Sequence, residues 1–243
     1  YDVLKTMSLE NVRYAEIRFA PLLSETSTMH CRAVIEALLK GLERGRADFE
    51  TRFGVITCAM RHHSQEDNSR MIKTAREYLG CGVCAADLAG AESAYPMSQF
   101  MELFQNTRKL DMPFTIHAGE CGSVQNVIDS VNAGAGRIGH GIALKGYYSI
   151  QRELADRGTG IEMCPISNLQ TKAVNSTAEY PIREFLNAGL KISINTDNRT
   201  VSNTSLVKEL QFIQTEYRIR DEEILLLMKN AVDTAFASED EKE

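Results

Sequence analysis

The feature of this sequence that most constrains its fold is a regular alternation of short apolar segments with longer amphipathic segments along all 243 residues. The short segments are rich in β-branched residues and are bounded by Gly, Pro or polar residues, as strands usually are. They begin near Val12, Phe53, Val83, Phe114, Arg137, Gly160 and Ile192. Strands that alternate with helices predict a parallel sheet covered by helices.

The amphipathic segments predict helices, because their apolar residues recur at helical spacing. The predicted ranges are residues 30–44, 68–79, 98–109, 123–133, 147–157, 181–188, 204–217 and 221–237. Gly134, Gly158 and Gly189 stand just past three of these ranges, where glycine is favoured, and Pro181 opens another. These residues therefore place the helix ends between the predicted strands.

Polar residues at the ends of the predicted strands favour a (β/α)₈ barrel over an open sheet, because barrel enzymes collect their active-site residues there. An open doubly wound sheet would show a Gly-rich phosphate turn after its first strand, and the sequence has none. Seven of the eight strands can be counted. The opening residues read as the tail of a helix, and residues 238–241 read as the start of another. We therefore expect one barrel domain over residues 1–243, truncated at both ends.

The charge balance excludes some functions. The net charge is −6, whereas nucleic-acid binding requires a clustered basic surface. No apolar run is long enough for a membrane span, and no signal-peptide pattern opens the chain. We expect a cytoplasmic protein with a small-molecule substrate and neither a nucleic-acid nor a membrane partner.

Three short motifs follow apolar runs and carry the residues that can do chemistry. They are residues 115–120 (TIHAGE), 137–141 (RIGHG) and 195–198 (NTDN). Each polar residue has a simpler interpretation alone: a structural His117, a solvated Glu120, a turn His140, or an Asp197 that caps the following turn. Together they place an imidazole and a carboxylate on separate strands, which suits zinc or another borderline divalent ion.

These motifs, with the flanking segments 18–21 (RFAP), 87–92 (DLAGAE) and 164–168 (CPISN), resemble the zinc-dependent adenosine deaminase family of the amidohydrolase superfamily. The resemblance spans most of the chain. It implies an amidohydrolase barrel that converts adenosine and 2′-deoxyadenosine to inosine and ammonia in purine salvage, with one zinc ion in the complete site.

The resemblance also implies roles for individual residues. His117 and Asp197 would bind zinc. Glu120 would be a neutral acid that protonates N1 of the purine, and His140 would orient the attacking water and act as base or electrostatic partner. The backbone N–H of Gly90 would meet purine N3. Asn198 would face N7, where many family members carry Asp; an amide donates a hydrogen bond at any pH, so purine recognition would be preserved.

One departure from the family pattern is larger. The first strand of the family carries a His-x-His pair that supplies two zinc ligands, and no such pair occurs among the five histidines of this chain. We interpret His62 and His63 as a loop pair, not as a substitute. We also expect structural roles for Arg13, Glu16 and Arg18, as members of a buried ion pair.

Two alternatives stay open at this point. The first is an adenine or other aminopurine deaminase, because the sugar-contacting residues would lie outside these motifs. The second is a catalytically incomplete fragment or binding module, which the missing ligands favour and which the presence of all four motif residues opposes. Turnover of adenosine compared with adenine separates the first alternative, and zinc content separates the second.

Overall fold

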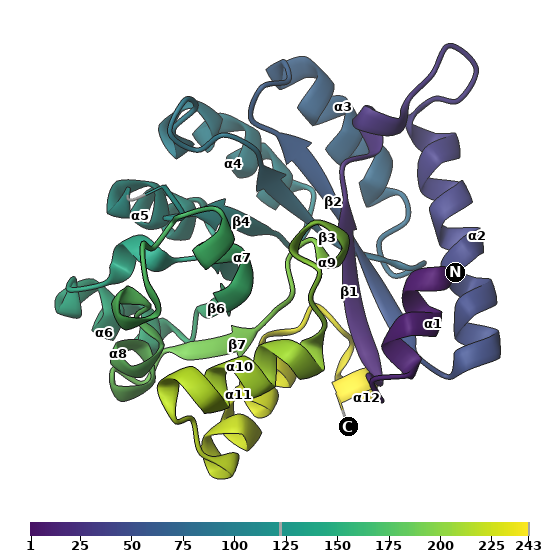
Figure 1. Ribbon diagram of the computed structural model, residues 1–243. Coiled ribbons are helices and arrows are strands. Elements are labelled where there is room, and N and C mark those ends of the chain that lie inside the picture. Colours follow the sequence, from purple (N-terminus) through teal and green to yellow (C-terminus); the bar gives the residue numbers. More distant parts are fainter. Residues whose placement is uncertain (122, 243) are drawn as a thin grey trace.

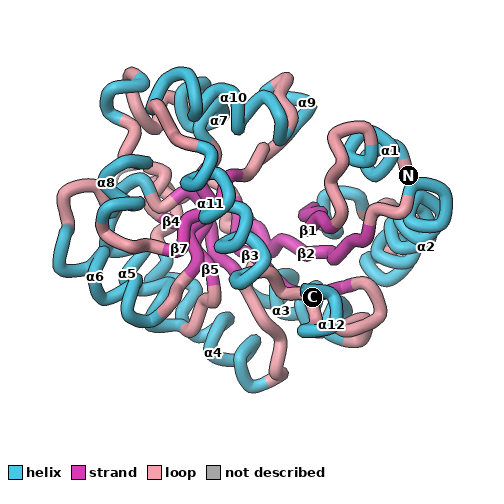
Figure 2. The backbone as a smooth tube through the Cα atoms, turned by 90° about the horizontal axis from the view of Figure 1, so that it is seen from below, coloured by secondary structure: helices cyan, strands magenta, loops and turns pink. Residues whose placement is uncertain are grey.

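The computed structural model describes residues 1–121 and 123–242 as an α/β structure with its strands gathered inside a ring of helices (Figures 1 and 2). Every predicted strand is present within these residues. The strands are β1 (Tyr14–Phe19), β2 (Arg52–Met60), β3 (Val83–Ala89), β4 (Thr115–Ala118), β5 (Arg137–His140), β6 (Gly160–Met163) and β7 (Lys191–Ile194). The alternation in the sequence therefore located the sheet.

The described strands are all parallel and follow one another in chain order. One sheet has the order β1-β2-β3 and the other β4-β5-β6-β7. A parallel bridge between Ala86 of β3 and Phe114, just before β4, joins the two sheets. Within the described residues β1 and β7 each have one unpaired edge. The prediction of a barrel with seven of eight strands is confirmed.

The predicted helices are present with small shifts at their ends. They are α2 (Cys31–Phe49), α3 (Gln65–Arg76), α4 (Met101–Lys109), α5 (Val124–Ala133), α6 (Tyr148–Arg157), α8 (Ile182–Asn187), α10 (Leu206–Tyr217) and α11 (Asp221–Thr234). The range 98–109 divides into a 3-10 turn, Met97–Phe100, and α4. At the two ends of the described chain, α1 (Asp2–Ser8) and α12 (Glu239–Lys242) match the helical segments that the sequence indicates there.

Two short helices were not predicted from the sequence: α7 (Pro165–Gln170) and α9 (Arg199–Ser202). Each lies within a few residues of the end of a strand, α7 after β6 and α9 after β7. At six and four residues they are too short to show a helical period. Both matter for the site, because they position the side chains that follow β6 and β7.

A continuous apolar core fills the space between the sheet and the helices. Ile138 of β5, Ile161 of β6 and Ile192 of β7 are fully buried, and the long α2 packs its apolar face against the same core. None of the helices in the described residues combines the length and apolarity that crossing a membrane requires.

Candidate active site

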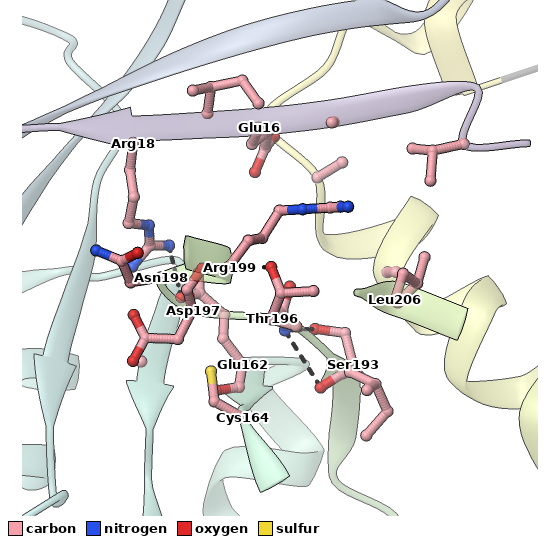
Figure 3. A pocket seen from close by; sticks show the side chains of 18 of the residues that line it. Glu16, Arg18, Glu162, Cys164, Ser193, Thr196, Asp197, Asn198, Arg199 and Leu206 are labelled. Atoms are coloured by element: carbon pink, nitrogen blue, oxygen red, sulfur yellow. Dashed lines mark hydrogen bonds and ion pairs between the residues drawn. The ribbon is translucent and has the colours of Figure 1, made fainter. Parts of the chain in front are cut away.

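A cavity of about 540 Å³ lies between β1 and β7 and collects most of the predicted site residues. His117, His140, Asp197 and Asn198 line it. In Figure 3, Glu16 and Arg18 extend from β1 into this space, and Asp197, Asn198 and Arg199 face them from beyond β7. Glu120 and Gly90 are not among the lining residues. Glu120 nevertheless lies close to a residue that lines the cavity, because its Oε2 is 3.7 Å from Nε2 of His140.

His117 is held by a buried carboxylate that the sequence did not single out for this role. Nδ1 of His117 lies 2.8 Å from Oδ2 of Asp87, which is fully buried on β3. Although burial raises the pKa of Asp87, the charges of His117 and Arg18 outweigh it and hold that pKa below its usual value. A carboxylate on one ring nitrogen fixes the ring and its tautomer, which leaves Nε2 of His117 free to bind a metal.

His140 is held in an uncommon backbone conformation at the end of β5. Its φ is +66°, in the left-handed region that few non-glycine residues adopt. Gly139 permits the close approach to β4, because a Cβ there would lie 3.2 Å from Cα of His117. The two imidazole rings stand 5.1 Å apart. Burial, and then the neighbouring His117, lower the pKa of His140, so its neutral form is favoured.

Glu92 fixes the backbone that carries Glu120. Its buried carboxylate accepts hydrogen bonds from three successive backbone N–H groups, those of Gly119, Glu120 and Cys121, at 2.6, 3.0 and 3.1 Å. It also accepts a hydrogen bond of 2.8 Å from the amide of Asn126 on α5. A carboxylate on several N–H groups forms a strong, charge-assisted anchor. The Glu120 side chain is therefore delivered from a fixed turn.

Asp197 and Asn198 form the turn between β7 and α9. Asp197 has a φ of +51°, and its Oδ2 accepts a hydrogen bond of 2.7 Å from the hydroxyl of Ser167. Asn198 caps α9, because its Oδ1 accepts one of 3.0 Å from the backbone N–H of Val201. That bond occupies the acceptor of the side chain and leaves the NH₂ group of Asn198 to donate into the cavity.

Helix α7, which the sequence did not predict, contacts all three polar groups at the mouth. Ser167 donates to Asp197, the amide of Asn168 lies 2.9 Å from Nδ1 of His140, and Thr171 just after the helix donates to Glu120 at 3.2 Å. Ser, Asn and Thr are common in ordinary turns. Apart from the family resemblance of residues 164–168, no sequence signal distinguishes these three residues from a surface loop.

A network of buried and partly buried ion pairs lies along the cavity from β1 to β6. Arg18 pairs with Asp87 at 3.2 Å and with Glu162 at 2.6 Å. Arg137 pairs with Glu162 at 2.7 Å and with Glu16 at 2.5 Å. The expected structural roles of Glu16 and Arg18 agree with these contacts. Arg13 was expected to join them, but it is exposed, so that prediction was wrong.

The residues present fit part of a metal site. Nε2 of His117 and one oxygen of Asp197 are donors that zinc accepts. Catalytic zinc sites usually have three protein ligands, and no group of three or more His, Cys, Asp or Glu suited to a metal occurs in residues 1–121 and 123–242. His62 and His63 pack against each other after β2, with rings 4.5 Å apart, as a loop pair would.

A parallel barrel that gathers His, Glu, His and Asp at its strand ends defines a hydrolase of the amidohydrolase type. The adenosine deaminase family model matches residues 1–243. The chain is 41% identical over 242 residues to an adenosine deaminase of Enterococcus faecalis and 39% identical over 243 residues to one of Streptococcus agalactiae; each match covers 100% of this chain and 72% of the relative. This chain belongs to the adenosine deaminase family.

A solved structure agrees on the fold. An amidohydrolase from Burkholderia ambifaria, with bound Zn, superimposes with a TM-score of 0.93 at 22% identity, over 100% of this chain and 68% of that one. The relatives and this structure are all longer than the present chain. The structural likeness supports the barrel fold, and the family match supports a hydrolytic deaminase.

Proposed function

We propose that the cavity between β1 and β7 hydrolyses adenosine, and 2′-deoxyadenosine, to inosine and ammonia with the help of one zinc ion. The observation that carries this proposal is that His117, His140 and Asp197 line one cavity while Glu120 lies 3.7 Å from His140. These are the groups that binding a metal, handling water and protonating a purine ring require.

His117 and Asp197 would hold the metal ion. The bond from Asp87 fixes the His117 ring, and the bond from Ser167 leaves one oxygen of Asp197 for the ion. A bound zinc ion acidifies water from a pKa of about 15.7 towards about 7. Zinc is favoured over harder divalent ions because an imidazole belongs to the ligand set.

His140 and Glu120 would move the protons. Addition of water at C6 forms a C–O bond, and the ring nitrogen N1 takes a proton from Glu120. His140 removes the proton of the attacking water through Nε2, the nitrogen on the Glu120 side. The C6–N bond then breaks as His140 passes the proton that it took from water to the amine, which leaves as ammonia, and the hydroxyl on C6 returns a proton to Glu120 as the carbonyl forms. Oxygen enters and nitrogen leaves, so no oxidant or reductant is needed.

Gly90 and Asn198 would recognise the purine. Gly90 follows β3 with a φ of +106° that a side chain would strain, and its backbone N–H would donate to N3. Asn198 keeps its NH₂ group for N7 because its Oδ1 caps α9. Two donors at opposite edges of the ring system would orient C6 towards the metal.

We further propose that residues 1–243 form a single barrel domain that a further strand completes between β1 and β7. The two unpaired edges border the cavity, and exposed edges are normally covered or paired. A strand in this position could supply the metal ligands that are missing beside His117 and Asp197. The six cysteines are free thiols, which suits the reducing cytoplasm, where we place this reaction as part of purine salvage.

The test compares adenosine, adenine and adenosine monophosphate as substrates of one purified sample whose zinc content is measured. We expect the absorbance change from adenosine to inosine to be fastest, with about one zinc ion per active site. Faster turnover of adenine would replace the proposed substrate. Turnover that survives complete removal of zinc would contradict the metal-assisted mechanism.

A further inference from the structure

Asn168 has a buried side-chain amide, and only one of its two polar atoms has a hydrogen-bond partner within the described residues. It lies on α7 with no exposed surface. Its Nδ2 stands 2.9 Å from Nδ1 of His140, whereas its Oδ1 is buried and has no hydrogen-bond partner within the described residues. An unpaired buried acceptor costs about 1–3 kcal/mol, so such a group requires a reason.

The chemistry of His140 supplies that reason. A neutral imidazole carries one hydrogen, either on Nδ1 or on Nε2. If Nδ1 accepts a bond from Asn168, the hydrogen is on Nε2 and that nitrogen cannot take a proton. If Nδ1–H donates to Asn168, the lone pair on Nε2 faces Glu120. Only the second tautomer can act as a base through Nε2.

The amide can serve this second tautomer without any rearrangement of the helix. Nδ2 and Oδ1 of Asn168 are nearly equal in size, so a half-turn of the amide exchanges them in the same space. The backbone stays fixed, because the N–H of Asn168 donates to the carbonyl of Cys164 at 2.9 Å and its own carbonyl accepts from Val174 at 3.3 Å. The exchange brings the unpaired oxygen onto Nδ1 of His140 and places the NH₂ group in the position that has no partner within the described residues.

We propose that Asn168 is a positioning residue that holds His140 in its Nδ1–H tautomer, with Oδ1 of Asn168 accepting that hydrogen and the lone pair of Nε2 turned towards Glu120 and the cavity. The proposal rests on the proposed role of His140 as the base for water. Asn168 touches neither the substrate nor the metal, and it acts only through His140.

The experiment compares Asn168→Leu and Asn168→Asp in the active zinc enzyme. Leucine removes the hydrogen bond at similar size. Aspartate can only accept one, so it should keep the Nδ1–H tautomer. We expect Asn168→Leu to lower kcat about 100-fold with KM changed less than about threefold, and Asn168→Asp to keep kcat within about tenfold of wild type.

The tautomer itself is measured independently of turnover. Ring ¹⁵N chemical shifts of histidine-labelled protein distinguish Nδ1–H from Nε2–H, and the chain has five histidines to assign. We expect Nδ1–H at His140 in the wild type and its loss in Asn168→Leu. The matched control is Asn230→Leu, which deletes a buried amide that bonds to the carbonyl of Ile192 and should leave the His140 shifts unchanged.

The outcomes separate this proposal from the proposed function. A wild type with Nε2–H at His140, or an Asn168→Leu variant with normal kcat, would overturn the role of Asn168 even in a fully active deaminase. A wild type that does not deaminate adenosine would overturn the proposed function, while the ¹⁵N shifts would still decide the role of Asn168. If Asn168→Asp fails to fold, the wild-type shifts and Asn168→Leu suffice.

Discussion

The first half of the barrel, β1 to β3, differs from the second half, β4 to β7, in the length of its strands and in the role of its residues. Strands β1, β2 and β3 have six, nine and seven residues, whereas β4 to β7 have four each. The proposed metal ligands and catalytic groups all come from the strands of the second half or follow them. The first half and its loops contribute Arg18, Asp87 and Glu92, which hold those groups in place.

The difference shows how the fold separates chemistry from support. His140 and Asp197 adopt positive φ values at or soon after the ends of short strands, and such conformations persist only where the surroundings hold them. The supporting charges of the first half are paired and largely buried, so removing one partner should lower the free energy of unfolding strongly, because the other charge is left buried and unpaired. We therefore expect the loss of one side chain to have a different effect in each half of the barrel.

The largest effect should come from the second half. Glu120→Gln keeps the size and the backbone anchor of Glu120 but cannot deliver a proton, so kcat should fall about 10³-fold, with zinc content and thermal stability unchanged. Steady-state kinetics on adenosine with metal analysis provides the measurement. The exposed Glu216→Gln on α10 is the control. Near-normal turnover of Glu120→Gln would remove the proposed acid.

The next effect should appear in stability, at the contact between the two halves. Arg137→Met leaves the partly buried Glu16 and the buried Glu162 without their shared partner, so the free energy of unfolding should fall by about 3 kcal/mol. Urea denaturation measures it. The control is Arg157→Met, which breaks an exposed pair with Glu153 on α6 and should cost less than about 0.5 kcal/mol. Equal losses would mean that burial does not distinguish the two pairs.

A smaller effect should link the first half to the metal. Asp87→Asn removes the charge that fixes His117, so zinc affinity should fall about 10- to 100-fold while the metal still binds. Competition with a chelator measures the affinity, and the exposed Asp156→Asn on α6 is the control. Unchanged affinity would contradict a supporting role for the first half of the barrel.

The sequence predicts the seven strands and the strand-end residues because both depend on local pattern. Apolar runs bounded by Gly and polar residues locate the strands, and residues at the ends of parallel strands must lie near one another. The local pattern therefore predicts that His117, His140 and Asp197 lie near one another, and all three line one cavity. The ion pair of Arg18 with Glu162 joins residues 144 positions apart, and no local pattern specifies which buried charges meet.

The role of α7 could not be predicted for a related reason. A six-residue helix shows no period, and residues 165–168 are informative in the sequence only as part of a family resemblance. The functions of Ser167 and Asn168 depend on how the end of β6 turns towards β5 and β7. That direction is a property of the assembled sheet, so the supporting residues can be recognised only when the strands are placed side by side.

The second half also has a support of its own, and this gives the smallest predicted effect. Glu209 on α10 is fully buried and accepts bonds from the backbone N–H of Ile166 and the hydroxyl of Thr204. Burial raises its pKa to about 7. Because the native state favours the neutral acid, ionisation of Glu209 costs stability as the pH rises from about 4.5 to about 7, and the cost persists above that range.

Glu209→Gln should remove this dependence, since glutamine can accept from Ile166 and donate to Thr204 at every pH. Relative to wild type, the variant should gain about 1–2 kcal/mol in the free energy of unfolding at about pH 8 and little or nothing at about pH 5. Urea denaturation at both pH values tests this, with the exposed Glu222→Gln as the control. A variant that is less stable than wild type at the higher pH would show that α7 is held by the charge of Glu209. The second half would then depend on a buried ion, as the first half does.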